Sequence, residues 1–225
     1  MGEAIGQVLS FGVGVALSPV PIIAVVLLLA TPHGRVNGPA FIAGWIIGLA
    51  AAGTILLFAA SGAEASSSGS PEEWVSIVKI VLGVLLLALA AREWRGRPRG
   101  DAGPELPKWM KAIDTFNAPK AAGIGVLLSA LNPKNLILTV GAAAAIAQTG
   151  VSTGDQAVAL AVFVALGTLG PGIPVGIFFL MRDRAADILE SLRGWMAREN
   201  TTIMAVLCLI IGAKLIGDAI SALSG

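Results

Sequence analysis

An apolar run, residues 121–147, is interrupted near its middle by Asn-Pro-Lys-Asn at residues 132–135. The first apolar run, residues 4–30, is interrupted at the matching place by Ser-Pro-Val-Pro at residues 18–21. Proline inside a helix removes a backbone hydrogen bond and clashes with the preceding turn, at a cost of roughly 3 kcal/mol. In lipid, irregular backbone survives only against protein or a watery cavity. Paired breaks of this kind predict the central site of a transporter.

The apolar runs are long enough to cross a bilayer, which takes about 20 residues. Of the 225 residues, 56% are hydrophobic and 13% are charged, about half the charged share of soluble domains. These values leave no room for a large soluble domain and predict an all-α integral membrane protein. The lone Cys208 excludes a disulfide framework. The predicted spans are residues 4–30, 38–60, 74–91, 121–147, 156–181 and 201–222.

Lysine and arginine fall on one side of these spans. The connections after the first, third and fifth spans are basic, whereas the opposite side carries only acidic charges, such as Glu64 and Asp155. By the positive-inside rule both termini lie outside the cytoplasm, in a multi-pass protein of the plasma membrane. Because residues 1–3 have no positive side chain, we expect residues 4–30 to be retained as a span and not cleaved as a signal peptide.

The chain divides into two halves of similar plan. We predict a first three-helix repeat at residues 1–97, a cytoplasmic linker rich in Arg, Pro and Gly at residues 98–113, and a second repeat at residues 114–225. Each half has an odd number of spans, so the second copy must be inserted upside down. The predicted fold is therefore six transmembrane helices in an inverted 3+3 repeat, with the first and fourth helices broken.

Lys134 is the most informative residue because a central lysine in a membrane span costs roughly 2.5 to 3.5 kcal/mol and should face protein or water. It could hold an anionic headgroup, take part in proton coupling, or tether the broken helix to carbonyl groups of a neighbour. Ser18 could cap the half-helix that begins at Val20, and the asparagines could satisfy backbone freed by Pro133. The candidate translocation residues are Ser18, Pro19, Pro21, Asn132, Pro133, Lys134 and Asn135.

The fifth span contains three glycines and two prolines within residues 167–174, which we expect to interrupt the helix. Such a break could act as a hinge or let another backbone pass closely. The candidate hinge residues are Gly167, Gly170, Pro171 and Pro174.

Two further sets of charges lie in or beside the spans. Lys214 and Asp218 are four residues apart, the spacing for an ion pair on one helix face, and a proton relay is the alternative. Lys79 lies near the end of its span, so we expect it to reach the outer interface without chemistry of its own.

In the fifth connection, residues 188–196 show helical spacing and predict a short amphipathic helix on the inner membrane surface.

The sequence gives no support for an enzyme. It has no GxSxG, HExxH or GxxxxGK[ST] motif, and one histidine cannot form a conventional metal cluster. We therefore expect no catalytic residue, no metal and no cofactor. The basic residues flank spans and lack interleaved aromatic residues, so we expect no nucleic-acid binding.

With Asn132-Pro133-Lys134 in the fourth span and Ser18-Pro19 in the first, the chain resembles the LysE superfamily of small exporters. Its length, central linker and the context from Leu131 to Asn135 are most similar to the GAP/Sap family, the glycopeptidolipid- and sulfolipid-addressing proteins of mycobacteria and their relatives. The resemblance implies a role in moving envelope glycolipids, alongside large lipid transporters of the MmpL type.

We accordingly expect a transporter or export factor for a glycolipid or similar amphipathic lipid, with the two broken centres facing each other at mid-depth. The alternatives are an exporter of amino acids or other small solutes, which the same superfamily implies, and a non-transporting scaffold for a larger lipid pump. The glycine-rich helix faces are also compatible with a homodimer.

Overall fold

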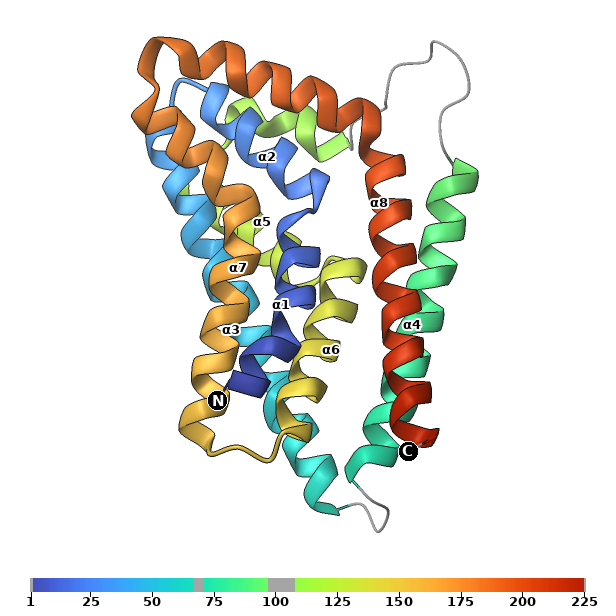
Figure 1. The fold of residues 1–225 in the computed structure, drawn as a ribbon. Coiled ribbons are helices and arrows are strands. Elements are labelled where there is room, and N and C mark those ends of the chain that lie inside the picture. Colours follow the sequence, from blue (N-terminus) through green and yellow to red (C-terminus); the bar gives the residue numbers. More distant parts are fainter. Residues whose placement is uncertain (1, 67–70, 97–107, 225) are drawn as a thin grey trace.

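The computed structural model describes residues 2–66, 71–96 and 108–224. In this part of the chain every regular element is a helix (Figure 1). The elements are α1 (Gly2–Ala16), α2 (Pro19–Ala30), α3 (Gly34–Ser66), α4 (Pro71–Gly96), η1 (Lys108–Thr115), α5 (Ala118–Ala130), α6 (Pro133–Gln148), α7 (Thr153–Leu180), η2 (Arg182–Arg184) and α8 (Ala185–Ser224).

The helices have the length and composition of membrane spans. Four helices of the described residues, α3, α4, α7 and α8, could each cross a bilayer. The pairs α1–α2 and α5–α6 qualify when each is taken as one bent span, with bends of 53° and 60°. The chain is therefore a multi-pass membrane protein with four to six spans, and Figure 1 shows both termini at the same end of the molecule.

The bends lie where the sequence predicts breaks, because the prolines begin new helices. Pro19 is the first residue of α2 and Pro133 is the first residue of α6. The first position of a helix suits proline, since its missing N–H would have no partner there. The predicted breaks in the first and fourth apolar runs are thus confirmed.

Glycines bring the helices into close backbone contact. A β-carbon on Gly44 of α3 would lie 2.0 Å from the carbonyl oxygen of Ala122 of α5. One on Gly170 of α7 would lie 1.9 Å from the carbonyl oxygen of Ala16 of α1. A β-carbon on Gly83 of α4 would lie 2.8 Å from the carbonyl oxygen of Gly212 of α8. Small residues thus set the pairs α3–α5, α1–α7 and α4–α8.

The prediction that residues 167–174 interrupt the fifth span is wrong. Helix α7 continues through Pro171 and Pro174 without a break. Each proline follows a glycine by four residues, so the carbonyl that its ring crowds belongs to Gly167 or Gly170, the residue type whose backbone adjusts most easily. These glycines instead lie against α1, which agrees with the interpretation that another backbone passes closely. The hinge role stays a prediction.

The fifth connection joins the last span. Residues 188–196, predicted as a separate short helix, belong to the first part of α8, which runs across one end of the molecule before it turns beside α4 (Figure 1). Leu189 and Met196 are buried there, so this part packs on the protein itself. Of the predicted linker, residues 98–107 lie outside the described residues and residues 108–113 belong to η1.

Gly170→Ala should lower the thermal unfolding midpoint in detergent, because the added methyl group would meet the backbone of α1. Overpacking of this kind costs about 1–3 kcal/mol. Gly176→Ala on the same helix is the matched control, since nothing lies within 4 Å of the position that its methyl group would take. Equal midpoints for the two variants would contradict the close packing of α1 and α7.

Candidate functional site

The two helix breaks meet through a pair of buried side chains. Ser18, between α1 and α2, donates its hydroxyl hydrogen to Asn135 Oδ1 at 2.9 Å. Asn135 Nδ2 in turn donates to the carbonyl oxygen of Leu128, in the last turn of α5, at 3.0 Å. That carbonyl belongs to the end of a helix, where backbone oxygens lack intrahelical partners. Asn135 therefore caps α5 across the break and holds the other break beside it.

Asn132 completes this junction, which we call the break junction (Ser18, Asn132, Lys134 and Asn135). Asn132 Oδ1 accepts a hydrogen bond from the backbone nitrogen of Lys134 at 3.0 Å and so caps α6. The predicted role of the asparagines in satisfying freed backbone is what the structure shows. The predicted cap by Ser18 is wrong, because its hydroxyl makes no bond to the start of α2 and goes to Asn135 instead.

Lys134 is buried at the break junction, with 2% of its surface exposed. Its Nζ atom has no hydrogen-bond partner among the described residues, so it does not tether the helix to neighbouring carbonyl groups. The thiol of Cys208 on α8 lies within electrostatic range of it. An ionisable group kept at this depth without a partner points to function, because packing alone would favour an apolar residue.

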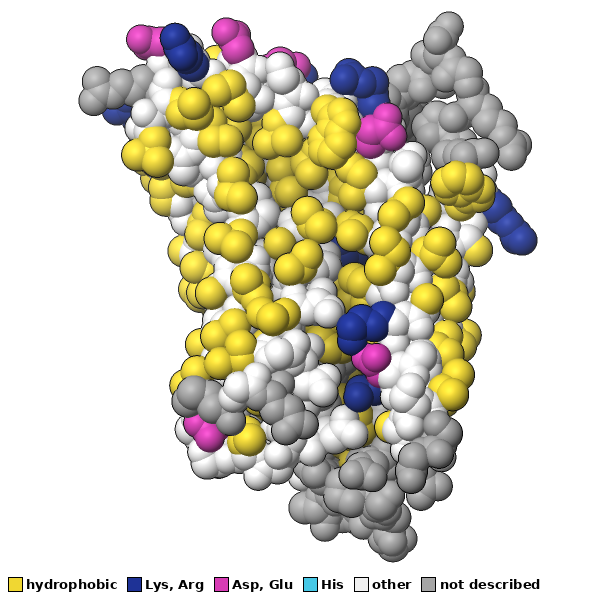
Figure 2. All heavy atoms as spheres, in the orientation of Figure 1, with side chains coloured by type: hydrophobic (Ala, Val, Ile, Leu, Met, Phe, Trp, Pro, Cys, Tyr) yellow, Lys and Arg dark blue, Asp and Glu magenta, His cyan; other side chains and the backbone are white. Residues whose placement is uncertain are grey.

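A second polar region lies between α1, α4, α6 and α8. It is a cavity of about 610 Å³, here called the charged crevice. Figure 2 shows basic and acidic side chains together between hydrophobic surfaces, beside the lower part of α8. The residues that line the crevice are Gly6, Gln7, Lys79, Gln148, Thr149, Lys214, Asp218, Ser221 and Ala222.

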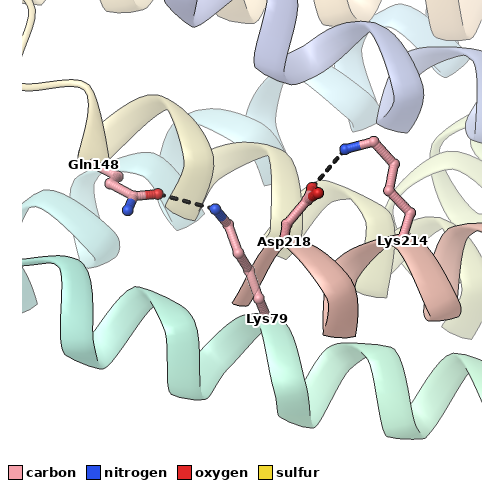
Figure 3. A network of polar contacts seen from close by, with 4 residues as sticks. All are labelled: Lys79, Gln148, Lys214 and Asp218. Atoms are coloured by element: carbon pink, nitrogen blue, oxygen red, sulfur yellow. Dashed lines mark hydrogen bonds and ion pairs between the residues drawn. The ribbon is translucent and has the colours of Figure 1, made fainter. Parts of the chain in front are cut away.

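Four side chains from three helices converge in the charged crevice (Figure 3). Lys79 Nζ of α4 donates to Gln148 Oε1 of α6 at 3.0 Å. Lys214 Nζ and Asp218 Oδ2, both of α8, form an ion pair at 2.5 Å. The charge of Asp218 also attracts Lys79, and that of Lys214 repels it. The three charged groups therefore interact with one another, and Gln148 joins them as a neutral acceptor.

These charges lie on helices that are long and apolar enough to cross a membrane, at Trp74–Gly96 for Lys79 and Ala185–Leu223 for Lys214 and Asp218. Gly83 and Gly212 mark the point where α4 and α8 cross. At about 1.5 Å per residue, Lys214 lies about 3 Å, Lys79 about 6 Å and Asp218 about 9 Å along its helix from that crossing. Half of a bilayer's hydrocarbon core measures about 15 Å. All three distances from the crossing are shorter than that half-thickness.

The structure shows the setting of Lys79. Only 5% of its surface is exposed, and its ammonium group bonds Gln148, the last residue of α6. Its position relative to the outer interface stays a prediction. Sequence reasoning missed Gln148 altogether. The available signal was that the four groups share one side of the predicted membrane. Lys79 lies early in the inward span 74–91, Lys214 and Asp218 lie late in the outward span 201–222, and Gln148 directly follows the outward span 121–147. The ion pair of Lys214 and Asp218 is present, and a relay stays a prediction.

The predicted site residues thus separate into two places. Ser18, Asn132, Lys134 and Asn135 come together at the break junction, and Gly170 touches Ala16, two residues before Ser18. Lys214 and Asp218 belong instead to the charged crevice.

Bent helices joined at a buried polar junction, with a charged crevice beside them, define a multi-pass membrane protein built around broken spans. The family model described as "Sap, sulfolipid-1-addressing protein" matches residues 8–221, and the chain belongs to this family. The Sap part of the resemblance is thereby confirmed. No curated protein and no solved structure gives a significant match to the chain.

Removing the hydrogen bond between the breaks should destabilise the protein. We expect Ser18→Ala to cost about 0.5–1.5 kcal/mol, the net value of a typical hydrogen bond. Asn135→Ala should cost about 1–3 kcal/mol, because it leaves the Leu128 carbonyl unsatisfied as well. Ser191→Ala, at an exposed position of α8, is the control.

A double-mutant cycle on Ser18 and Asn135, measured by unfolding in mixed detergent, isolates the interaction. The double variant should lose less than the sum of the two single losses. Strict additivity would show that the two breaks are not coupled.

Proposed function

We propose that this protein moves an envelope glycolipid or similar amphipathic lipid across or out of the plasma membrane. Membership of the sulfolipid-1-addressing family supports a role in lipid export or localisation. The observation that carries the proposal is the charged crevice, which places polar groups at membrane depth and opens toward the side of the molecule.

The lateral opening favours a lipid over a small hydrophilic solute. The Lys214 and Asp218 side chains are 51% and 39% exposed although they lie on a membrane helix. A solute exporter needs a chamber shielded from the lipid. A crevice open to the side instead lets a headgroup enter while its acyl chains remain in the hydrocarbon.

Apolar surface suited to those chains lies along the same helices. A groove of about 440 Å³ runs between α4 and α8 on the other side of the Gly83–Gly212 crossing. Its lining is almost wholly apolar and includes Trp94. The groove and the charged crevice together provide the two environments that an amphipathic molecule needs. The residues of this groove are Leu87, Ala90, Ala91, Trp94, Ala205, Val206 and Leu209.

An inverted repeat accounts for how the helices pack. If α1–α2 corresponds to α5–α6, α3 to α7 and α4 to α8, then the most extensive contacts between the two halves have their mirrors. The pair α3–α5 matches α7–α1, α4–α6 matches α8–α2, and α4–α8 is its own counterpart. This pattern supports six crossings related by a pseudo-two-fold axis, and with it a place within the LysE superfamily.

The charge distribution supports the proposed orientation. Lysine and arginine side chains gather at the end of the molecule opposite the termini in Figure 2, and the positive-inside rule makes that end cytoplasmic. Both termini and the charged crevice then face outward. Movement of a headgroup from the inner leaflet requires the break junction to open, with Lys134 as its contact at mid-depth. A large lipid transporter of the MmpL type is the proposed partner for further export.

Deletion of this protein should remove a glycolipid from the cell surface and cause it to accumulate inside. The measurement is lipid analysis of surface-extractable and total fractions from the parent strain, the deletion strain and the complemented deletion strain. A surface lipid profile identical to that of the parent would refute the proposed function.

Lys134→Met should abolish surface display of that lipid while membrane insertion is retained. Methionine keeps a similar length and apolar stem but supplies no cation. Lys120→Met is the control, because Lys120 is exposed at the start of α5. Complementation with each variant, with protein levels compared in isolated membranes, gives the answer. Full export by Lys134→Met would remove this residue from the mechanism.

A further inference from the structure

We propose that the charged crevice is a binding site for a sulfate or phosphate ester, and that Asp218 is a built-in competitor for that anion. The lipid origin of the ester rests on the proposed function, whereas the anion chemistry rests on the crevice alone. The inference follows from the charges and hydrogen-bond groups that line this cavity.

The charges in the crevice do not balance. Lys79 and Lys214 contribute two positive charges and Asp218 contributes one negative charge. Asp218 is paired with Lys214 at 2.5 Å, whereas the hydrogen bond of Lys79 goes to a neutral amide oxygen. Lys79 and Lys214 thus share the single carboxylate of Asp218, and a buried cation without an anion of its own is costly. The crevice therefore has a place for one further negative charge.

The hydrogen-bond groups suit an ester of an oxyacid. An ammonium group has three N–H donors, so Lys79 keeps two after its bond to Gln148. The Gln148 amide nitrogen adds donors of its own beside it. Sulfate and phosphate esters present several acceptor oxygens on one centre and can bond all of these groups. A carboxylate, with two oxygens, would satisfy fewer of them.

The size of the crevice fits a headgroup larger than a bare ion. Its volume of about 610 Å³ lies within the range of about 300–1,000 Å³ for small-molecule sites. A sulfate or phosphate group fills only part of that space, which leaves room for the sugar that carries it. Gln7 and Thr149, on the wall of the crevice, offer polar groups for such a sugar.

Asp218 gives the inference its sharpest consequence. Its carboxylate forms an ion pair with Lys214, so an arriving anion must compete with it. Replacing Asp218 by asparagine raises the charge of the crevice by one unit and frees Lys214. If Asp218 only positioned Lys214 on the same helix, the same replacement would weaken binding.

The test uses the full chain in nanodiscs of neutral phosphatidylcholine. The probe is a fluorescent sulfated galactosylceramide, with the unsulfated galactosylceramide as its matched control and inorganic sulfate as a competitor. Binding is measured by energy transfer from tryptophan, and folding is checked by size-exclusion chromatography. The variants are Lys79→Gln, Lys214→Met and Asp218→Asn, with Lys120→Met as the control outside the crevice.

We expect the wild-type protein to prefer the sulfated lipid. Lys79→Gln and Lys214→Met should each weaken its binding about tenfold, the value of one charge-assisted hydrogen bond. Asp218→Asn should strengthen binding several-fold, and Lys120→Met should leave it unchanged. Lys214→Met, at a half-exposed position, keeps the test valid should the buried Lys79 variant fail to fold.

Any of three results would overturn the inference. Weaker binding by Asp218→Asn, or unchanged binding by Lys214→Met, would show that the cluster is structural. No preference between the two lipids, together with full displacement by millimolar inorganic sulfate, would assign the crevice to a soluble anion. A normal surface lipid profile after deletion would refute the proposed function and leave these binding results untouched, so the two failures are distinguishable.

Discussion

Backbone groups left without partners inside a bilayer are the constraint on which this structure depends. The prolines at positions 19 and 133 end two helices at depth, and each end exposes carbonyl oxygens that lipid cannot satisfy. Asn135 resolves much of this problem, since its amide nitrogen bonds the end of α5 and its amide oxygen accepts from Ser18. The hydrogen bond from Ser18 to Asn135 thus joins the two breaks.

Close packing follows from that junction. Helices that must meet at a buried polar contact have to approach each other tightly, and glycines at the crossings allow it. Gly170 lies against Ala16, only two residues from Ser18, so α7 is held beside the first break. Gly44 holds α3 against α5, the helix that ends at the second break. Helices α4 and α8 pack against each other at Gly83 and Gly212. The charged crevice lies between this pair and the broken helices.

The polar groups of the membrane region have two different environments. Lys134 is enclosed at the break junction without a hydrogen-bond partner among the described residues. Lys79, Lys214 and Asp218 lie in a crevice that opens to the side. Under the proposed function, these environments correspond to an accessible site and an occluded one, and passage between them requires the bond of Ser18 to Asn135 to open.

The sequence by itself determined the features that depend on local chemistry. Runs of apolar residues gave the spans, proline gave the helix starts at positions 19 and 133, and a four-residue spacing brought Lys214 to Asp218. Tertiary structure decided what depends on distant neighbours. It kept α7 continuous through Pro171 and Pro174, directed the hydroxyl of Ser18 to Asn135, and turned Lys79 toward Gln148. Local propensity fixes where a helix can begin, whereas the partner of a buried polar group is set by whichever residue the packing brings within 3 Å.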